Sequence, residues 1–227
     1  MSSIEQRRQM AAAIVDFEAR RDAAGRLMVY HPPSGDGGGA FEVAGINARY
    51  NRTTARTLAD LIATHRFEEA ERLAIDFIAS NTDCAASWTD VPAIEFYLRD
   101  SVFNRGATGG ALILQWALGV ERDGKVGPVT RAAAAAAAPA DLLTHLRKAR
   151  EQYERHIVHR DERSQFWAGL SARWDKAVIV AERFPMIAAP GPTVEAAAAS
   201  PVLAGGSDAP RGSRPPASRM IDHAVNS

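Results

Sequence analysis

Apolar residues recur at helical spacing over most of the first 185 residues of the chain. Three- and four-residue spacings are typical of amphipathic helices, and strand signals are nearly absent outside residues 26–46. The pattern predicts a mainly α class with a small β element. The expected helices are 4–19, 53–62, 67–80, 92–103, 109–118, 132–138, 139–153 and 166–178.

Two short β-prone segments, 26–30 and 41–46, flank the glycine-rich sequence Ser34–Ala40 and predict a small hairpin. After Phe184-Pro185 the composition changes to Ala, Pro, Gly and Ser. The tail 186–227 has too few large apolar side chains to offset the entropy of ordering, so we expect it to be disordered or a linker.

Composition narrows the classes of partner. The chain has 27 Lys+Arg and 27 Asp+Glu residues, so no net field attracts nucleic acid or acidic membranes. Its single cysteine excludes an internal disulfide and a cysteine-based metal site. His156 and His159 have a spacing that can bind metal, but a surface pair is the favoured interpretation. We expect no metal, no cofactor, no signal peptide and no membrane insertion.

Glu18 is the first candidate for catalysis. It closes the apolar pattern of the first helix, and a turn-rich segment and the glycine cluster follow it. Partial burial of a carboxylic acid disfavours its charged form, so a proton can be retained near neutral pH for general acid catalysis. The alternative is a solvated glutamate at a helix end.

A resemblance to a known family follows from residues 100–131. Its ordered pieces are Asn104-x-Gly106, Leu114-Gln115, Leu118-Gly119, Asp123-Gly124, Gly127-Pro128 and Thr130. They resemble the predicted peptidoglycan domain that forms the C-terminal half of glycoside hydrolase family 108 lysozymes, the N-acetylmuramidases of phages and bacteria. The resemblance implies a lysozyme-like helical fold with a small hairpin near the active site. It implies a catalytic half over 1–90 and a peptidoglycan-domain half over 91–185, before the tail 186–227.

The N-terminal half departs from that family's pattern. Two glycines follow the family's catalytic Glu, whereas Ala19-Arg20 follow Glu18 here. Gly45-Ile46-Asn47 stands in the place of the family's Gly-Ile-Thr. The resemblance makes Glu18 the acid and Asp36, beside Gly37–Gly39, the second catalytic group.

Cleaving a β-1,4 bond between amino sugars needs a protonated carboxyl and a second polar group that supports the water or the oxocarbenium-like centre. Glu42 competes with Asp36 for the second role, and a plain turn residue is an equal interpretation of Asp36. A helix C-cap is the favoured alternative for Asn104. The candidates for substrate binding are Arg26, Tyr30, Gly38, Gly39, Asn47, Tyr50 and Asn104.

The resulting expectation is a monomeric, endolysin-like N-acetylmuramidase acting on peptidoglycan glycan strands. It would be made in the bacterial cytoplasm and act in the periplasm, with a holin as a possible partner for export. Two alternatives stay open: a non-catalytic peptidoglycan-binding module, and a phage structural protein whose tail docks on a partner.

Overall fold

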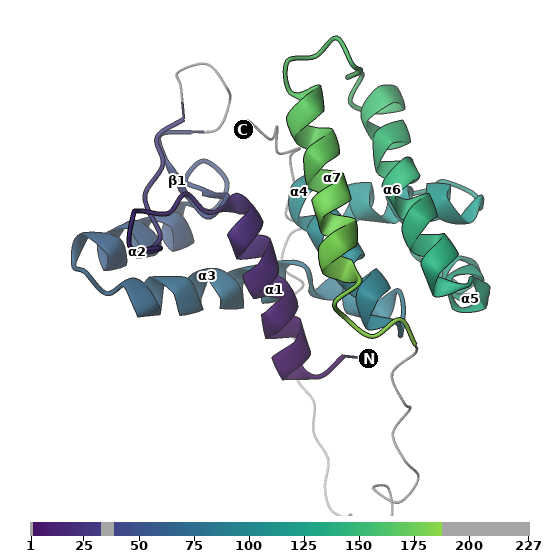
Figure 1. Ribbon diagram of the computed structural model, residues 1–227, viewed down its shortest axis with the longest axis horizontal. Coiled ribbons are helices and arrows are strands. Elements are labelled where there is room, and N and C mark those ends of the chain that lie inside the picture. The colour runs from purple at the N-terminus through teal and green to yellow at the C-terminus, as the bar shows by residue number, and fades with distance from the viewer. Residues whose placement is uncertain (1, 33–38, 188–227) are drawn as a thin grey trace, which may run out of the picture.

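The computed structural model describes residues 2–32 and 39–187, and within them the chain is mainly helical (Figure 1). The elements in chain order are α1 (Ile4–Glu18), β1 (Glu42–Val43), β2 (Ile46–Asn47), α2 (Arg52–Ala63), α3 (Phe67–Asn81), the 3-10 helix η1 (Asp83–Ser87), α4 (Pro92–Leu118), α5 (Pro128–Ala136), α6 (Pro139–His156) and α7 (Trp167–Ala181). The mainly α class with a small hairpin is confirmed.

Helix α4 is the central element, because it contacts both groups of helices. Figure 1 shows α1, α2, α3 and the hairpin on one side of the molecule and α5, α6 and α7 on the other. Helix α4 packs against α1 and η1 as well as α6 and α7. Its first half is buried all round from Pro92 to Arg105, so the charged residues that it contains must be paired inside the fold.

The structure joins two predicted helices, 92–103 and 109–118, into α4 with a kink between them. Gly106 has φ +70° and ψ 172°, a left-handed conformation that interrupts the helix without ending the element. Gly119 ends α4 at φ +66°, as expected of a C-terminal glycine.

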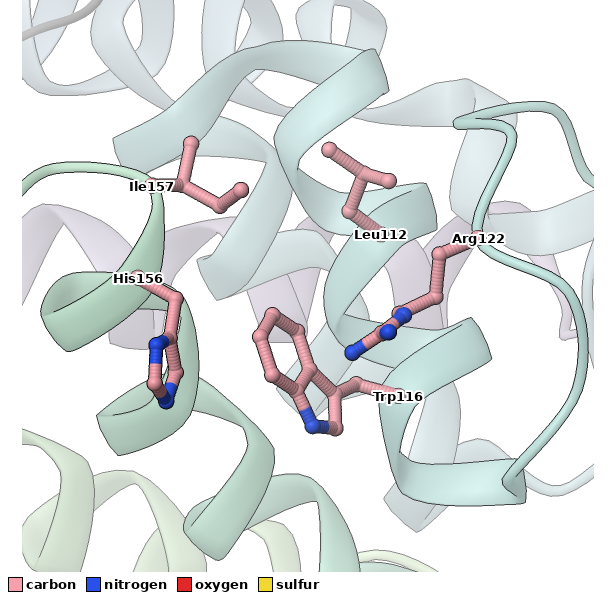
Figure 2. Close-up of a pocket in the computed structure, with 5 residues that line it drawn as sticks. All are labelled: Leu112, Trp116, Arg122, His156 and Ile157. Carbon is pink, nitrogen blue, oxygen red and sulfur yellow. The ribbon is translucent and has the colours of Figure 1, made fainter.

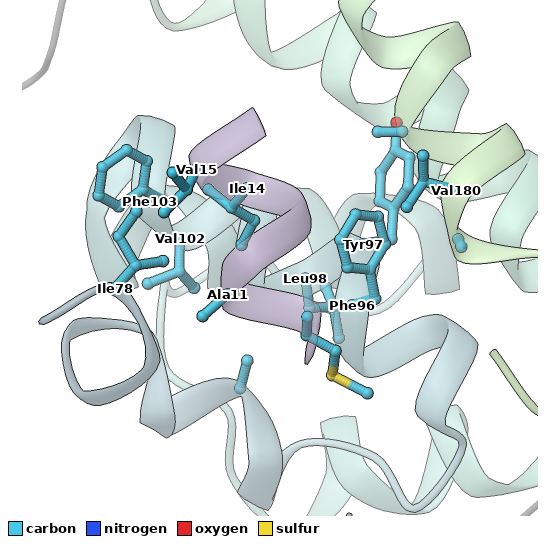
Figure 3. Close-up of a cluster of buried hydrophobic side chains, with 14 of the residues drawn as sticks. Ala11, Ile14, Val15, Ile78, Phe96, Tyr97, Leu98, Val102, Phe103 and Val180 are labelled. Atoms are coloured by element: carbon cyan, nitrogen blue, oxygen red, sulfur yellow. The ribbon is translucent and has the colours of Figure 1, made fainter. Parts of the chain in front are cut away.

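One continuous core fixes the end of α1 against α4 (Figure 3). Ile14 and Val15 are fully buried, and they pack in the same cluster as Val102 and Phe103 of α4. Since these side chains set the rotation of α1 about its axis, they also set the direction in which its last residue, Glu18, projects.

The hairpin differs in detail from the sequence prediction. Strands β1 and β2 pair antiparallel, with Val43 opposite Ile46, so the turn lies inside the predicted second strand. Ala44 and Gly45 have φ +49° and +71°, and two positive values in a two-residue turn match the twist of a hairpin. Of the predicted first strand, Leu27 and Tyr30 form isolated bridges, Tyr30 with Glu42.

The chain stays packed on α4 beyond its last helix. The Phe184 ring stacks on Phe96 with centroids 5.2 Å apart, and the Pro185 carbonyl accepts a hydrogen bond from Ala93 N at 3.2 Å. The folded body therefore includes Phe184-Pro185. The prediction for the tail falls mostly on residues 188–227, which lie outside the described residues.

Candidate active site at Glu18

The Glu18 carboxyl lies where α1, the hairpin turn, α4 and α7 meet. Its side chain is 15% exposed, and its Oε1 lies 2.7 Å from Nη2 of Arg173 on α7. A Cβ added to Gly45 would lie 3.1 Å from Glu18 Oε2 and 3.1 Å from Cε1 of Phe103. The turn, the phenyl ring and the guanidinium thus hold a carboxyl that solvent still reaches.

Asp100 anchors the arginine that pairs with Glu18. Arg173 Nη2 also lies 2.7 Å from Oδ1 of Asp100, whose side chain is fully buried. Arg150 of α6 donates to the second oxygen, Oδ2, of the same carboxylate. The result is a chain of alternating charges, Glu18–Arg173–Asp100–Arg150, that links four helices.

The pKa shifts of Asp100 and Arg173 both favour the charged forms of these side chains. Burial alone would raise the pKa of Asp100, but the charges of Arg173 and Arg150 outweigh burial and hold that pKa below its usual range. Burial would lower the pKa of Arg173, but Asp100 and then Glu18 raise it above its ordinary value. Arg173 is therefore a permanent cation beside Glu18.

This geometry differs from the isolated acid that the sequence predicts. The Glu18 carboxyl is paired with the Arg173 guanidinium at 2.7 Å and is 15% exposed. Since Arg173 has a second carboxylate partner in Asp100, Glu18 can lose its contact with Arg173 without leaving a buried cation unpaired.

The predicted second catalytic group cannot be placed beside Glu18. Asp36 and Gly38 lie outside the described residues, so their roles stay predictions. Glu42 is half-buried in β1, and its backbone exchanges two 2.9 Å hydrogen bonds with Tyr30.

The other predicted residues of the hairpin region form a packed group. Asn47 is 2% exposed, and its Oδ1 accepts a hydrogen bond from Arg49 N at 2.8 Å. Gly39 has φ +85°, and its backbone lies so close to the Asn47 side chain that an added Cβ would be 2.9 Å from Asn47 Oδ1. The Arg49 guanidinium lies over the Tyr50 ring, with its Cζ 5.4 Å from the ring centroid. Asn47 therefore supports the loop in this conformation, and substrate binding by these residues stays a prediction.

Arg26 and Tyr30 are more accessible, and each has a neighbour. Arg26 Nε donates to Asp22 Oδ2 at 2.8 Å, and its guanidinium stacks over Phe67 at 4.4 Å. Arg20 lies over the Tyr30 ring at 5.1 Å. Asn104 is 2% exposed instead, and its Nδ2 donates to the Asp100 carbonyl at 2.8 Å, which is a structural contact within α4.

Sequence reasoning missed Asp100, Arg150 and Arg173 as parts of the site. The local sequence did not single out Asp100, because Glu95, Arg99 and Arg105 are also charged residues of α4. Arg150 and Arg173 stand among other charged residues of α6 and α7, so their sequences carry no signal of burial either.

The motif behind the family resemblance builds a loop. Gln115 is 1% exposed, and its Nε2 donates to Asp123 Oδ1 at 2.6 Å and to the Lys125 carbonyl at 3.0 Å. Its Oε1 accepts from Gly124 N at 2.9 Å. The bond from Gln115 and one from Lys125 N lower the pKa of Asp123. These motif residues thus fasten the segment after α4 to the helix.

Comparison with known proteins agrees with that motif. Residues 109–174 match a family described as the predicted peptidoglycan domain. The structure of SagA from Brucella abortus is similar in fold, with a TM-score of 0.55 at 18% sequence identity, over 80% of this chain and 97% of that one. No curated protein matches the chain. Residues 109–174 are called the peptidoglycan-domain segment because of this match, whereas membership of glycoside hydrolase family 108 stays a prediction.

Two further properties of the described residues bear on the site. No helix within 2–32 and 39–187 has the length and apolar character needed to cross a membrane. The same part of the chain holds no group of three or more His, Cys, Asp or Glu side chains placed to bind a metal ion.

Gly45→Ala should displace the Glu18 carboxyl and destabilise the fold. The left-handed φ costs a non-glycine residue roughly 1–2 kcal/mol, and the new methyl group would press on the Glu18 carboxyl. Gly25→Ala is the matched control, because Gly25 has φ +78° but open space around the added Cβ. Thermal unfolding should therefore show a larger loss of stability in Gly45→Ala than in Gly25→Ala. Equal losses in the two variants would contradict the close approach.

Proposed function

We propose that the chain is a peptidoglycan hydrolase that cleaves the β-1,4 bond between N-acetylmuramic acid and N-acetylglucosamine. The observation that carries the proposal is the Glu18 carboxyl, held in a fixed, 15% exposed position by Gly45, Phe103 and Arg173. The match of residues 109–174 to the predicted peptidoglycan domain supports the class of substrate.

In the proposed reaction, Glu18 donates a proton to the glycosidic oxygen as the bond to the leaving sugar breaks. The carboxylate that forms pairs with Arg173, which stabilises the charge as it develops. Water completes hydrolysis at the sugar carbon, where Asp36 is the proposed second group. Asp100 keeps Arg173 in place throughout, so it acts as a positioning residue.

A non-catalytic peptidoglycan-binding module is the second candidate. One observation favours it: Glu18 forms an ion pair with a buried arginine, as many structural carboxylates do. Ala19-Arg20 after Glu18, where the resembling family has two glycines, points the same way. The two candidates differ in whether glycosidic bonds are broken.

Product analysis of digested peptidoglycan tests the proposal. An N-acetylmuramidase releases fragments with a reducing N-acetylmuramic acid, which borohydride converts to muramitol. A glucosaminidase would leave reducing N-acetylglucosamine, and a lytic transglycosylase would leave an anhydro sugar. We expect muramitol. Binding to the wall without any released fragment would support the binding module instead.

The endolysin role belongs to the same proposal and rests on the family resemblance of the sequence. In this role the protein reaches the periplasm with the help of a holin and acts there on the wall. Expression alone should leave cells intact, and permeabilising the inner membrane should then cause lysis.

A further inference from the structure

A cavity of about 550 Å³ lies in the peptidoglycan-domain segment, apart from Glu18. Its lining comes from α4 beyond the Gly106 kink, from the loop after α4 and from the end of α6. The residues that line it are Leu112, Trp116, Arg122, His156 and Ile157 (Figure 2). Its volume is that of a pocket for a small ligand.

The pocket combines an apolar wall with nitrogen-bearing side chains. Leu112 and Ile157 supply the apolar part, and Ile157 is 47% exposed, which is high for a large apolar residue. Across from them stand Trp116, His156 and Arg122 (Figure 2). Such a mixture suits a ligand with small apolar groups and a negative charge.

The faces of the Trp116 indole are already occupied. The His156 imidazole stacks on it with centroids 5.5 Å apart and planes inclined by 23°. The Arg122 guanidinium lies over the same ring system at 4.3 Å, and Figure 2 shows the two on opposite sides of the indole. The indole therefore offers no free face for stacking a pyranose, which argues against a sugar as the occupant.

Arg122 offers the charge that a ligand would meet. Its side chain is exposed, and within residues 2–32 and 39–187 it forms no ion pair. Stacking on Trp116 restricts the positions that the guanidinium can adopt. A carboxylate is the anion that this planar group binds best, through two parallel hydrogen bonds.

We propose that this pocket binds the stem peptide of peptidoglycan, with a free carboxylate on Arg122 and alanine methyl groups against Leu112 and Ile157. The inference rests on the proposed wall substrate and adds a second contact to it. A glycan strand at Glu18 would be held through its peptide as well, so glycan that carries free stem peptides would be bound more tightly than bare glycan.

The test uses a synthetic alanine-containing stem tetrapeptide with free carboxylates and the same peptide with every carboxylate amidated. Tryptophan fluorescence and NMR titration of the full chain should show saturable binding of the free acid, and binding of the amide about tenfold weaker or more. Arg122→Gln should weaken binding of the free acid to the same degree. Ile157→Ser should weaken both peptides.

Arg56→Gln is the matched control, because Arg56 is an exposed arginine of α2. It should bind the free acid like the wild type, and all variants should keep the wild-type melting temperature. Equal affinity for the acid and the amide, or unchanged binding by Arg122→Gln, would overturn the inference. The peptide has no glycosidic bond, so its binding does not depend on catalysis. If the protein binds the peptide but releases no fragment from peptidoglycan, the proposed activity is refuted and the pocket assignment stands.

Discussion

Glu18→Gln should lower the rate of peptidoglycan hydrolysis by about 10²–10⁴-fold, the range typical of a lost general acid. Glutamine keeps the shape of the side chain and an oxygen that can accept from Arg173, but it has no proton to donate. Binding to insoluble wall should persist, because the peptidoglycan-domain segment is untouched. Turnover and wall sedimentation, measured on the same preparations, check both statements.

Glu71→Gln is the control for this variant. Glu71 is also a partly buried glutamate paired with an arginine, at 2.7 Å from Arg21, but it lies on α3 outside the Glu18 site. It should retain wild-type turnover. Wild-type lysis by Glu18→Gln would remove this residue from the mechanism.

Asp100→Ala should destabilise the fold more than any other single change among the site residues. The variant leaves Arg150 and Arg173 without their shared, fully buried partner, and breaking a buried charge pair costs about 3–5 kcal/mol. Chemical denaturation should show this loss of unfolding free energy. Asp175→Asn, which removes a 59% exposed partner of Arg147, should cost less than about 1 kcal/mol.

The Asp100 carboxylate should also make the free energy of unfolding depend on pH. The pKa of Asp100 is lower in the folded chain than in the unfolded chain, so its contribution is complete above the unfolded pKa and is lost as the pH falls through the folded pKa. The milder Asp100→Asn variant should therefore lose less stability between neutral and acidic pH than the wild type. An identical pH dependence in both proteins would contradict the depressed pKa.

Local sequence determined most of the helices. Apolar spacing predicted a helix over 67–80, and α3 spans Phe67–Asn81. The predicted helix 109–118 ends as expected, since Gly119 follows it in the left-handed conformation, which glycine adopts without strain. These features depend on neighbours within one or two turns, so the order of residues is sufficient to specify them.

The hairpin was predicted in part. The predicted segments 26–30 and 41–46 meet at the Tyr30–Glu42 bridge, but the two-stranded sheet itself turns at Ala44-Gly45, inside the second segment. Val43 and Ile46 are both fully buried, and only a turn between them puts both side chains into the core. Burial of these two residues, a tertiary effect, therefore decided the register.

The site was predicted in part. Glu18 at the end of the first helix follows from sequence, since the apolar face of α1 and its last turn are local patterns. That Glu18 meets Arg173, 155 positions later in the chain, was decided only when α1 and α7 packed against α4. The spacing of charged residues in the sequence does not indicate which residues pair, because a salt bridge depends on where two distant surfaces come together. The sequence thus determined which carboxyl ends the helix, and the tertiary structure determined the cation that faces it.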